Sequence, residues 1–242
     1  MRENTFFSTQ TQEVYEYFES WLFSYSENKT NDGNKKSIYC DLYDFFYKKE
    51  IDSNKSDSKN YHNCIGCNFE EGCFTILDYL RRFSGSTSIS PYLTIYSLLF
   101  YHQAERLAVI YKELRYTSGK NFDWVSFPTL RTIKHWANFF KHPKAYMFLH
   151  HPSYFIETDP EKPNFLIQGI INTDFVDNFY KASADNTQLL QLFENGKKFK
   201  IFYPDLLQLT KDLCTEFSNI IPIIKLEKNA DKLRKYTIDN FE

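Results

Sequence analysis

Apolar residues recur every three or four positions through much of the first 145 residues, which is the period of an amphipathic α-helix. Between residues 12 and 25, for example, Val14, Phe18 and Trp21 fall on one helical face. The same pattern predicts three further helices, over 73–83, 90–116 and 128–142. Polar stretches rich in Ser, Asn, Asp and Lys separate them and indicate loops.

Turn and capping residues mark where these helices should begin and end. Gly85 follows the helix over 73–83, and glycine readily adopts the left-handed conformation that ends many helices. Ser90 followed by Pro91 is typical of an N-cap and a first helical residue. His142 precedes Pro143, which disfavours a helical conformation of the residue before it, so the helix that begins at 128 should end there.

Beyond residue 144 the pattern changes to short runs of β-branched and aromatic residues bounded by Pro, Asp, Asn or Gly, which is typical of strands. Strands are expected over 146–150, 154–158, 165–171 and 198–202, and helices over 174–181, 187–194, 205–220 and 226–236. The sequence therefore predicts a mainly α chain. Residues 1–145 form an N-terminal antiparallel helical bundle, and residues 146–242 form a smaller mixed α/β region.

Composition and charge restrict the possible functions. The chain has 242 residues, 42% of them hydrophobic, which is enough to fill a substantial core. A net charge of −2 produces no global field that attracts nucleic acid, so such a partner must meet a local patch. The polar start of the chain and the absence of a long apolar run predict a cytoplasmic protein without a membrane partner. There is no glycine-rich phosphate loop, dinucleotide fingerprint, zincin motif or nucleophile elbow.

The helix over 128–142 carries such a local patch. Arg131, His135, Asn138 and His142 share a stripe about 60° wide, opposite an apolar face. No acidic residue occurs from 124 to 156, while this stretch holds four of the six histidines and several cations. A basic surface of this kind attracts phosphate oxygens, which makes RNA the expected partner. The alternative is an ordinary solvated helix face, with a C-terminal histidine that offsets the helix dipole. The cations outside the stripe that we expect to bind RNA are Lys134, Lys141 and Lys144.

The segment from Ala137 to Pro143 resembles the motif region of HEPN domains, in which an arginine, commonly followed by Asn, precedes a histidine on the last helix of a bundle. Asn138 and His142 match the motif, whereas Ala137 stands where the arginine is expected. The resemblance implies a homodimeric helical bundle with metal-independent endoribonuclease activity that leaves a 2′,3′-cyclic phosphate. It also implies a toxin or phage-defence effector with an antitoxin or sensor partner. The substitution at 137 leaves open a second reading, a bundle that binds RNA or a protein without cleavage.

Each residue of the stripe can be given a role in RNA cleavage. His142 can transfer protons near neutral pH, and His135 is an alternative acid or base. Asn138 would orient the imidazole or the phosphate, and Arg131 or Lys141 would offset charge that grows in the transition state. Arg131 lies about 16 Å from His142 along the helix axis, too far to share one phosphate within a single chain.

A cysteine-rich segment offers a possible cofactor. His62, Cys64, Cys67 and Cys73 could hold a structural zinc that staples a loop over 62–73, with Cys40 as an alternative ligand. A second Cys-x-x-Cys pair is missing, so reduced structural thiols are the competing interpretation. No metal is needed for the proposed catalysis.

Overall fold

The computed structural model describes residues 2–24, 65–114, 124–141, 155–157, 169–181 and 199–224. The main helices of this part are α1 (Arg2–Ser24), α3 (Ile65–Phe83), α4 (Ile89–Glu113), α5 (Pro128–Lys141), α7 (Thr173–Lys181) and α9 (Leu206–Ser218). A 3-10 turn, η1 (Trp124–Ser126), precedes α5, and the four-residue α10 (Ile221–Ile224) follows α9. The prediction of a mainly α fold is confirmed.

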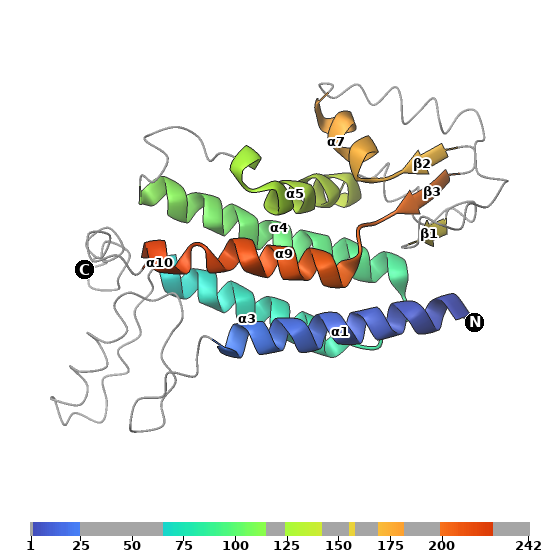
Figure 1. Cartoon of the computed structure of the whole chain (residues 1–242), viewed down its shortest axis with the longest axis horizontal. Helices are drawn as coiled ribbons and strands as arrows, with labels where there is room; N and C mark the ends of the chain where they lie inside the picture. The colour runs from blue at the N-terminus through green and yellow to red at the C-terminus, as the bar shows by residue number, and fades with distance from the viewer. Residues whose placement is uncertain are drawn as a thin grey trace, which may run out of the picture.

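The long helices α1, α3, α4 and α9 lie side by side with their axes running in similar directions, and α5 packs on the outer side of α4 (Figure 1). The described helices α1, α3, α4 and α5 alternate in direction along the chain, whereas α9 runs parallel to α1. Two hydrogen bonds show that α1 and α9 are parallel, because residue numbers increase together along both helices. Gln10 Nε2 donates to Asp205 Oδ2, and Trp21 Nε1 donates to Ser218 Oγ.

One phenylalanine from each of these four helices meets in the centre of the core. Phe18 and Phe100 make an edge-to-face contact with ring centroids 5.6 Å apart, as do Phe69 and Phe217 at 5.5 Å. Phe100 and Phe217 stack at 6.2 Å, which joins the two pairs. Such ring contacts add about 0.5–1.5 kcal/mol each beyond area burial. The helix α9 therefore shares one core with the helices before residue 145, and the division of the chain at that residue stays a prediction.

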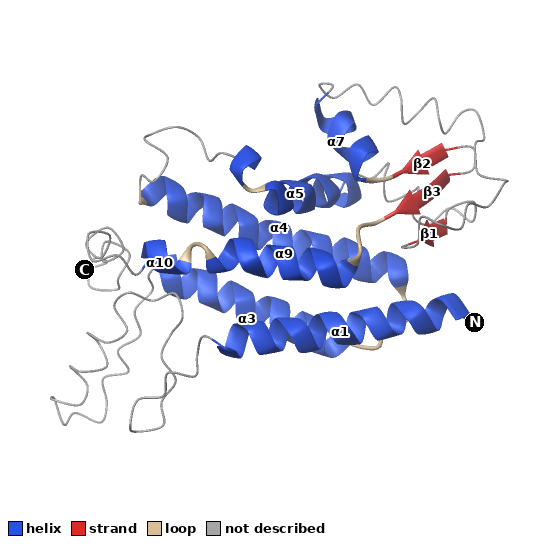
Figure 2. Cartoon of the chain, viewed as in Figure 1, coloured by secondary structure: helices blue, strands red, loops and turns tan. Residues whose placement is uncertain are grey.

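Three short parallel strands form a small sheet at one end of the bundle, beside α7 (Figure 2). The strand order is β1-β3-β2, with β1 at Phe155–Glu157, β2 at Gly169–Ile171 and β3 at Phe199–Phe202. These strands fall inside the ranges predicted over 154–158, 165–171 and 198–202. The strand predicted over 146–150 and the helices predicted over 187–194 and 226–236 lie outside the described residues.

Several helix ends differ from the predictions. Gly85 has φ +72° and ends α3 as expected. The N-cap of α4 is Ser88, two residues before the predicted Ser90. Pro91 then lies within the first helical turn, where it is tolerated because backbone N–H groups there make no hydrogen bond within the helix. A loop was expected over 62–73, and this prediction was wrong for 65–73, which is helical. Phe69 and Cys73, one turn apart, are buried there and extend the apolar face of α3.

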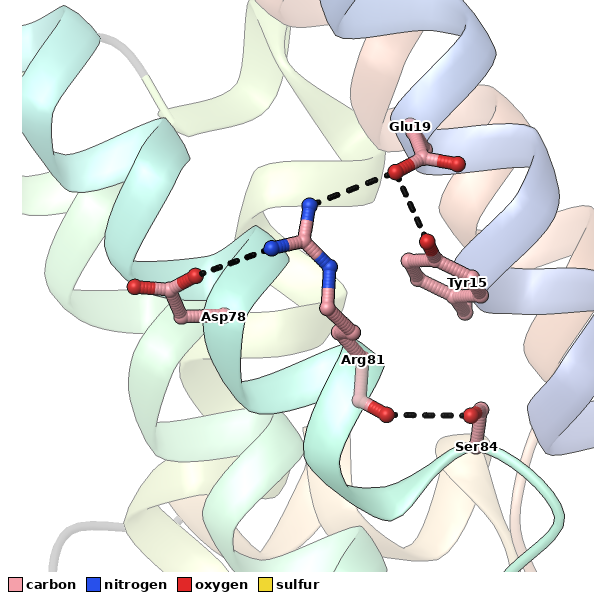
Figure 3. Close-up of polar contacts among 5 residues, drawn as sticks. All are labelled: Tyr15, Glu19, Asp78, Arg81 and Ser84. Atoms are coloured by element: carbon pink, nitrogen blue, oxygen red, sulfur yellow. Dashed lines mark hydrogen bonds and ion pairs between the residues drawn. The ribbon is translucent and has the colours of Figure 1, made fainter.

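A surface cluster around Arg81 links α3 to α1 (Figure 3). The Arg81 guanidinium lies 3.3 Å from Glu19 Oε1 and 3.7 Å from Asp78 Oδ1. Tyr15 donates its hydroxyl proton to the same Glu19 oxygen at 2.7 Å.

Within the described ranges, every helix is too short or too polar to traverse a lipid bilayer.

Candidate functional site

The helix α5 is amphipathic, as its sequence predicts. Its core side buries Leu130, Ile133, Trp136, Ala137 and Phe140. Arg131, His135 and Asn138 are partly exposed along the opposite side, with Lys134 beside them, and Lys141 is exposed at the end of the helix. His142 and Lys144 lie outside the described residues, so the structure places three of the four predicted catalytic residues on one stripe.

A carboxylate from another helix joins this stripe. Asp177 of α7 lies with Oδ1 2.6 Å from His135 Nδ1 and Oδ2 3.8 Å from the Arg131 guanidinium. The three side chains are 14–28% exposed, so water reaches the cluster without surrounding it. Asp177 was not among the predicted site residues, because 42 residues separate it from His135 in the sequence.

Local contacts fix α7 against α5 in the position that brings Asp177 to His135. The side chain of Asn172 accepts a hydrogen bond from the Phe175 amide at 3.0 Å and so caps the start of α7. Thr173 Oγ1 accepts a hydrogen bond from Trp136 Nε1 at 3.2 Å, which ties the first residue of α7 to the core side of α5. Val176 is fully buried in the same region.

A second distant carboxylate occupies the N-terminus of α5. Glu216 of α9 accepts hydrogen bonds from the Thr129 and Leu130 amides, both at 2.9 Å. These amides belong to the first turn of the helix, where no intrahelical acceptor exists. A helix N-terminus often binds phosphate, but here a protein carboxylate already fills that role.

Two lysines at the other edge of the stripe lie over aromatic rings. Lys134 Nζ is 4.0 Å from the centre of the Trp124 ring, and Lys141 Nζ is 5.6 Å from that of Tyr101. Such cation–π contacts contribute about 0.5–1 kcal/mol at exposed sites. Burial, assisted by a hydrogen bond with Glu105, raises the pKa of Tyr101 to about 12, so its ring stays neutral beside the lysine.

The position that departs from the HEPN motif points away from this surface. Ala137 is 0% exposed and lies on the core side of α5. An arginine at this position would have to leave a packed core to reach a phosphate. Position 137 therefore does not contribute to the surface of the stripe.

The described residues include only two of the four predicted zinc ligands, so the zinc site stays a prediction. His62 and Cys64 lie outside the described residues, and Cys67 and Cys73 lie on α3. Six residues of helix separate these two by about 9 Å along the axis, whereas two thiolates on one zinc lie roughly 4 Å apart. Cys73 is buried and accepts a hydrogen bond from Gln103 Nε2 at 3.2 Å. Among the described residues, no group of three or more His, Cys, Asp or Glu side chains could hold a metal.

A hollow of about 340 Å³ lies beside the N-terminal half of α5, between α5 and α9. Its polar lining consists of hydroxyl, amide and carboxylate groups, from Thr129, Thr132, Thr173, Asp205, Gln208 and Asp212. The two carboxylates make this side of α5 unfavourable for a phosphate. The cationic side of the stripe, where Lys134 lies, is the favourable one.

No family model, curated protein or solved structure matches the chain. The site itself combines an imidazole held by a carboxylate, a guanidinium one turn away and a flanking lysine. Such groups can transfer a proton next to a bound anion.

Proposed function

We propose that this chain acts on RNA as a metal-independent endoribonuclease of the HEPN type, with its active site on the polar face of α5. The observation that supports this proposal is the contact of both His135 and Arg131 with one carboxylate, that of Asp177. A carboxylate on Nδ1 selects the tautomer in which Nε2 accepts a proton, as in other acid–base sites that pair an acidic side chain with histidine.

In the proposed reaction, His135 Nε2 removes the proton from a ribose 2′-hydroxyl. The 2′-oxygen forms a bond to the adjacent phosphorus while the bond from phosphorus to the 5′-oxygen breaks. The products are a 2′,3′-cyclic phosphate and a 5′-hydroxyl, which takes up a proton. His142 would supply that proton, Arg131 would offset the charge on the phosphate, and Asn138 would orient it.

A second candidate function is RNA binding without cleavage. It is favoured by Ala137, which is buried where the motif arginine is expected, and by Asp177, which offsets the charge of Arg131. Binding through Lys134 and Lys141 requires neither an arginine at position 137 nor an unpaired Arg131. The two candidates differ in whether His135 is required.

The experiment compares cleavage of transfer RNA and total RNA by wild type, His135→Ala and Asp177→Asn in the presence of EDTA. His102→Ala, which removes an exposed histidine from α4, is the matched control. Loss of a general base should slow cleavage by about 10²- to 10⁴-fold in His135→Ala and leave His102→Ala unchanged. Equal cleavage by wild type and His135→Ala would refute the catalytic proposal. Absence of cleavage, with RNA binding that survives His135→Ala and weakens in Lys134→Glu, would support the second candidate.

The proposal includes the cellular role that the resemblance implies, a cytoplasmic, homodimeric toxin or phage-defence effector restrained by an antitoxin or sensor. Expression of wild type should then arrest bacterial growth, and expression of His135→Ala should not. Light scattering of the purified chain tests the dimer directly.

A further inference from the structure

Trp124 differs from the other tryptophans in its surroundings. The chain has three, of which Trp21 is 8% exposed and Trp136 is fully buried. Trp124 is partly exposed in η1, immediately before α5, and packs with one side against the core. The Lys134 ammonium lies 4.0 Å from the centre of its ring.

The contact with Lys134 of α5 relates the Trp124 ring to the proposed active site, which lies on the same helix. Lys134 follows Arg131 by one helical turn, so the two cations are neighbours on the same face. Trp124 therefore flanks the cluster of Arg131, His135 and Asp177 on its cationic side. The opposite side carries the hollow with the carboxylates of Asp205 and Asp212, which repel phosphate. A nucleic acid that places a phosphate at Arg131 is directed across Lys134 and Trp124.

We infer that Trp124 is a stacking platform for one unpaired base of the RNA, and that the substrate is accordingly single-stranded. The inference rests on the proposed function, since it takes RNA as the ligand. When the base arrives, Lys134 leaves the indole ring and pairs with an adjacent phosphate.

The relative strengths of the two contacts favour this exchange. A cation over an exposed aromatic ring shifts an equilibrium by about two- to fivefold. A base stacked on an aromatic side chain changes affinity by roughly five- to a hundredfold, and Lys134 gains a phosphate contact in addition. In a duplex each base is already stacked between its neighbours, so it cannot offer a face to Trp124.

The experiment uses the full chain with His135→Ala, so that RNA is bound without being cut. The probes are a short oligoadenylate and a duplex made of oligoadenylate and oligouridylate, with tryptophan fluorescence as the readout. Because Trp21 and Trp136 are buried, a change caused by the probe reports on Trp124. We expect the single strand to quench the fluorescence and the duplex to leave it unchanged. Trp124→Ala should raise the Kd of the single strand about tenfold, as measured by anisotropy of labelled RNA.

Two further variants control this comparison. Trp124→Phe keeps an aromatic face and should raise the Kd less than Trp124→Ala does. Val125→Ala changes the neighbouring side chain, which is 74% exposed, and should leave the Kd unchanged. Equal quenching by duplex and single strand, or the same Kd for Trp124→Ala and Val125→Ala, overturns the stacking platform.

Failure of this inference can be told apart from failure of the proposed function. If RNA is cleaved and cleavage requires His135, but Trp124→Ala leaves KM unchanged, stacking is refuted and the ribonuclease stands. If the single strand quenches Trp124 and Trp124→Ala weakens binding, but no cleavage occurs, stacking stands and the ribonuclease is refuted.

Discussion

Replacement of Glu216 by alanine should destabilise the protein through the first turn of α5. The Glu216 carboxylate accepts two backbone hydrogen bonds, from Thr129 and Leu130, both at 2.9 Å. Hydrogen bonds to a charged group contribute about 1.5–3 kcal/mol, and loss of a helix cap costs about 0.5–2 kcal/mol. Glu216 is partly exposed, so water replaces part of what is lost. We expect a decrease in the free energy of unfolding of about 2 kcal/mol for Glu216→Ala.

Urea denaturation followed by circular dichroism measures this decrease. In a chain of this length it corresponds to a fall in Tm of about 4–8 °C. Glu216→Gln keeps one acceptor oxygen and should lose about half as much. Glu13→Ala, at an exposed position on α1, is the control and should stay within about 0.5 kcal/mol of wild type.

Hydrogen exchange gives a local readout of the same contact. The Thr129 and Leu130 amides have no acceptor within α5, so their protection depends on Glu216. Both amides should exchange faster in Glu216→Ala, while amides in the middle of α4 change only as global stability changes. If the Thr129 and Leu130 amides keep their protection, or if Glu216→Ala is as stable as Glu13→Ala, the cap assigned to Glu216 is wrong.

Three further predictions concern buried or bridging groups. A Cβ on Gly72 would collide with the side chain of Gln103, whose amide nitrogen is held by hydrogen bonds to Phe69 and Cys73. Gly72→Ala should therefore lower the free energy of unfolding, measured in urea, by about 1–3 kcal/mol, although alanine has the higher helix propensity. Asp177→Ala should cost roughly 1–2 kcal/mol in the same assay, and Asp177→Asn less, because the amide oxygen still accepts from the His135 ring. Burial raises the pKa of four tyrosines besides Tyr101. Above about pH 10 the unfolded chain therefore releases protons that the folded protein retains, and stability present below this pH is lost above it. The four are Tyr79, Tyr92, Tyr96 and Tyr203. Each of the three buried ones should contribute a loss of about 1 kcal/mol between about pH 10 and 11, and the partly exposed Tyr79 should contribute less. Simultaneous ionisation of all tyrosines without unfolding would contradict this.

The helices could be predicted from the sequence because burial of one helical side requires apolar residues at every third or fourth position, and this spacing is visible in the sequence. The start of α5 was predicted at Pro128, since proline is favoured in the first turn of a helix, and α5 begins there. The start of α3 could not be predicted in this way. Gly66 and Asn68 have low helix propensity, but burial of Phe69 and Cys73 in the core outweighs this.

The candidate site was predictable only as far as it lies on one helix. The stripe of Arg131, His135 and Asn138 follows from helical geometry alone. Its partner Asp177 does not, because no local pattern identifies which distant helix packs against α5. The helix over 174–181 was expected, but its orientation depends on the burial of Val176 and on the hydrogen bond between Trp136 and Thr173.

The surroundings of α5 show that the number of charged residues in a sequence segment does not by itself determine the electrostatic field at that segment. No acid occurs between residues 124 and 156, yet the fold brings the carboxylates of Asp177 and Glu216 to the helix. Asp177 offsets Arg131 and orients His135, which favours proton transfer over simple attraction of phosphate. Lys134 and Lys141 lie over neutral aromatic rings, which leave their charge intact. In the proposed function, the cationic attraction for RNA therefore belongs mainly to the two lysines, and the chemistry belongs to His135 and Asp177.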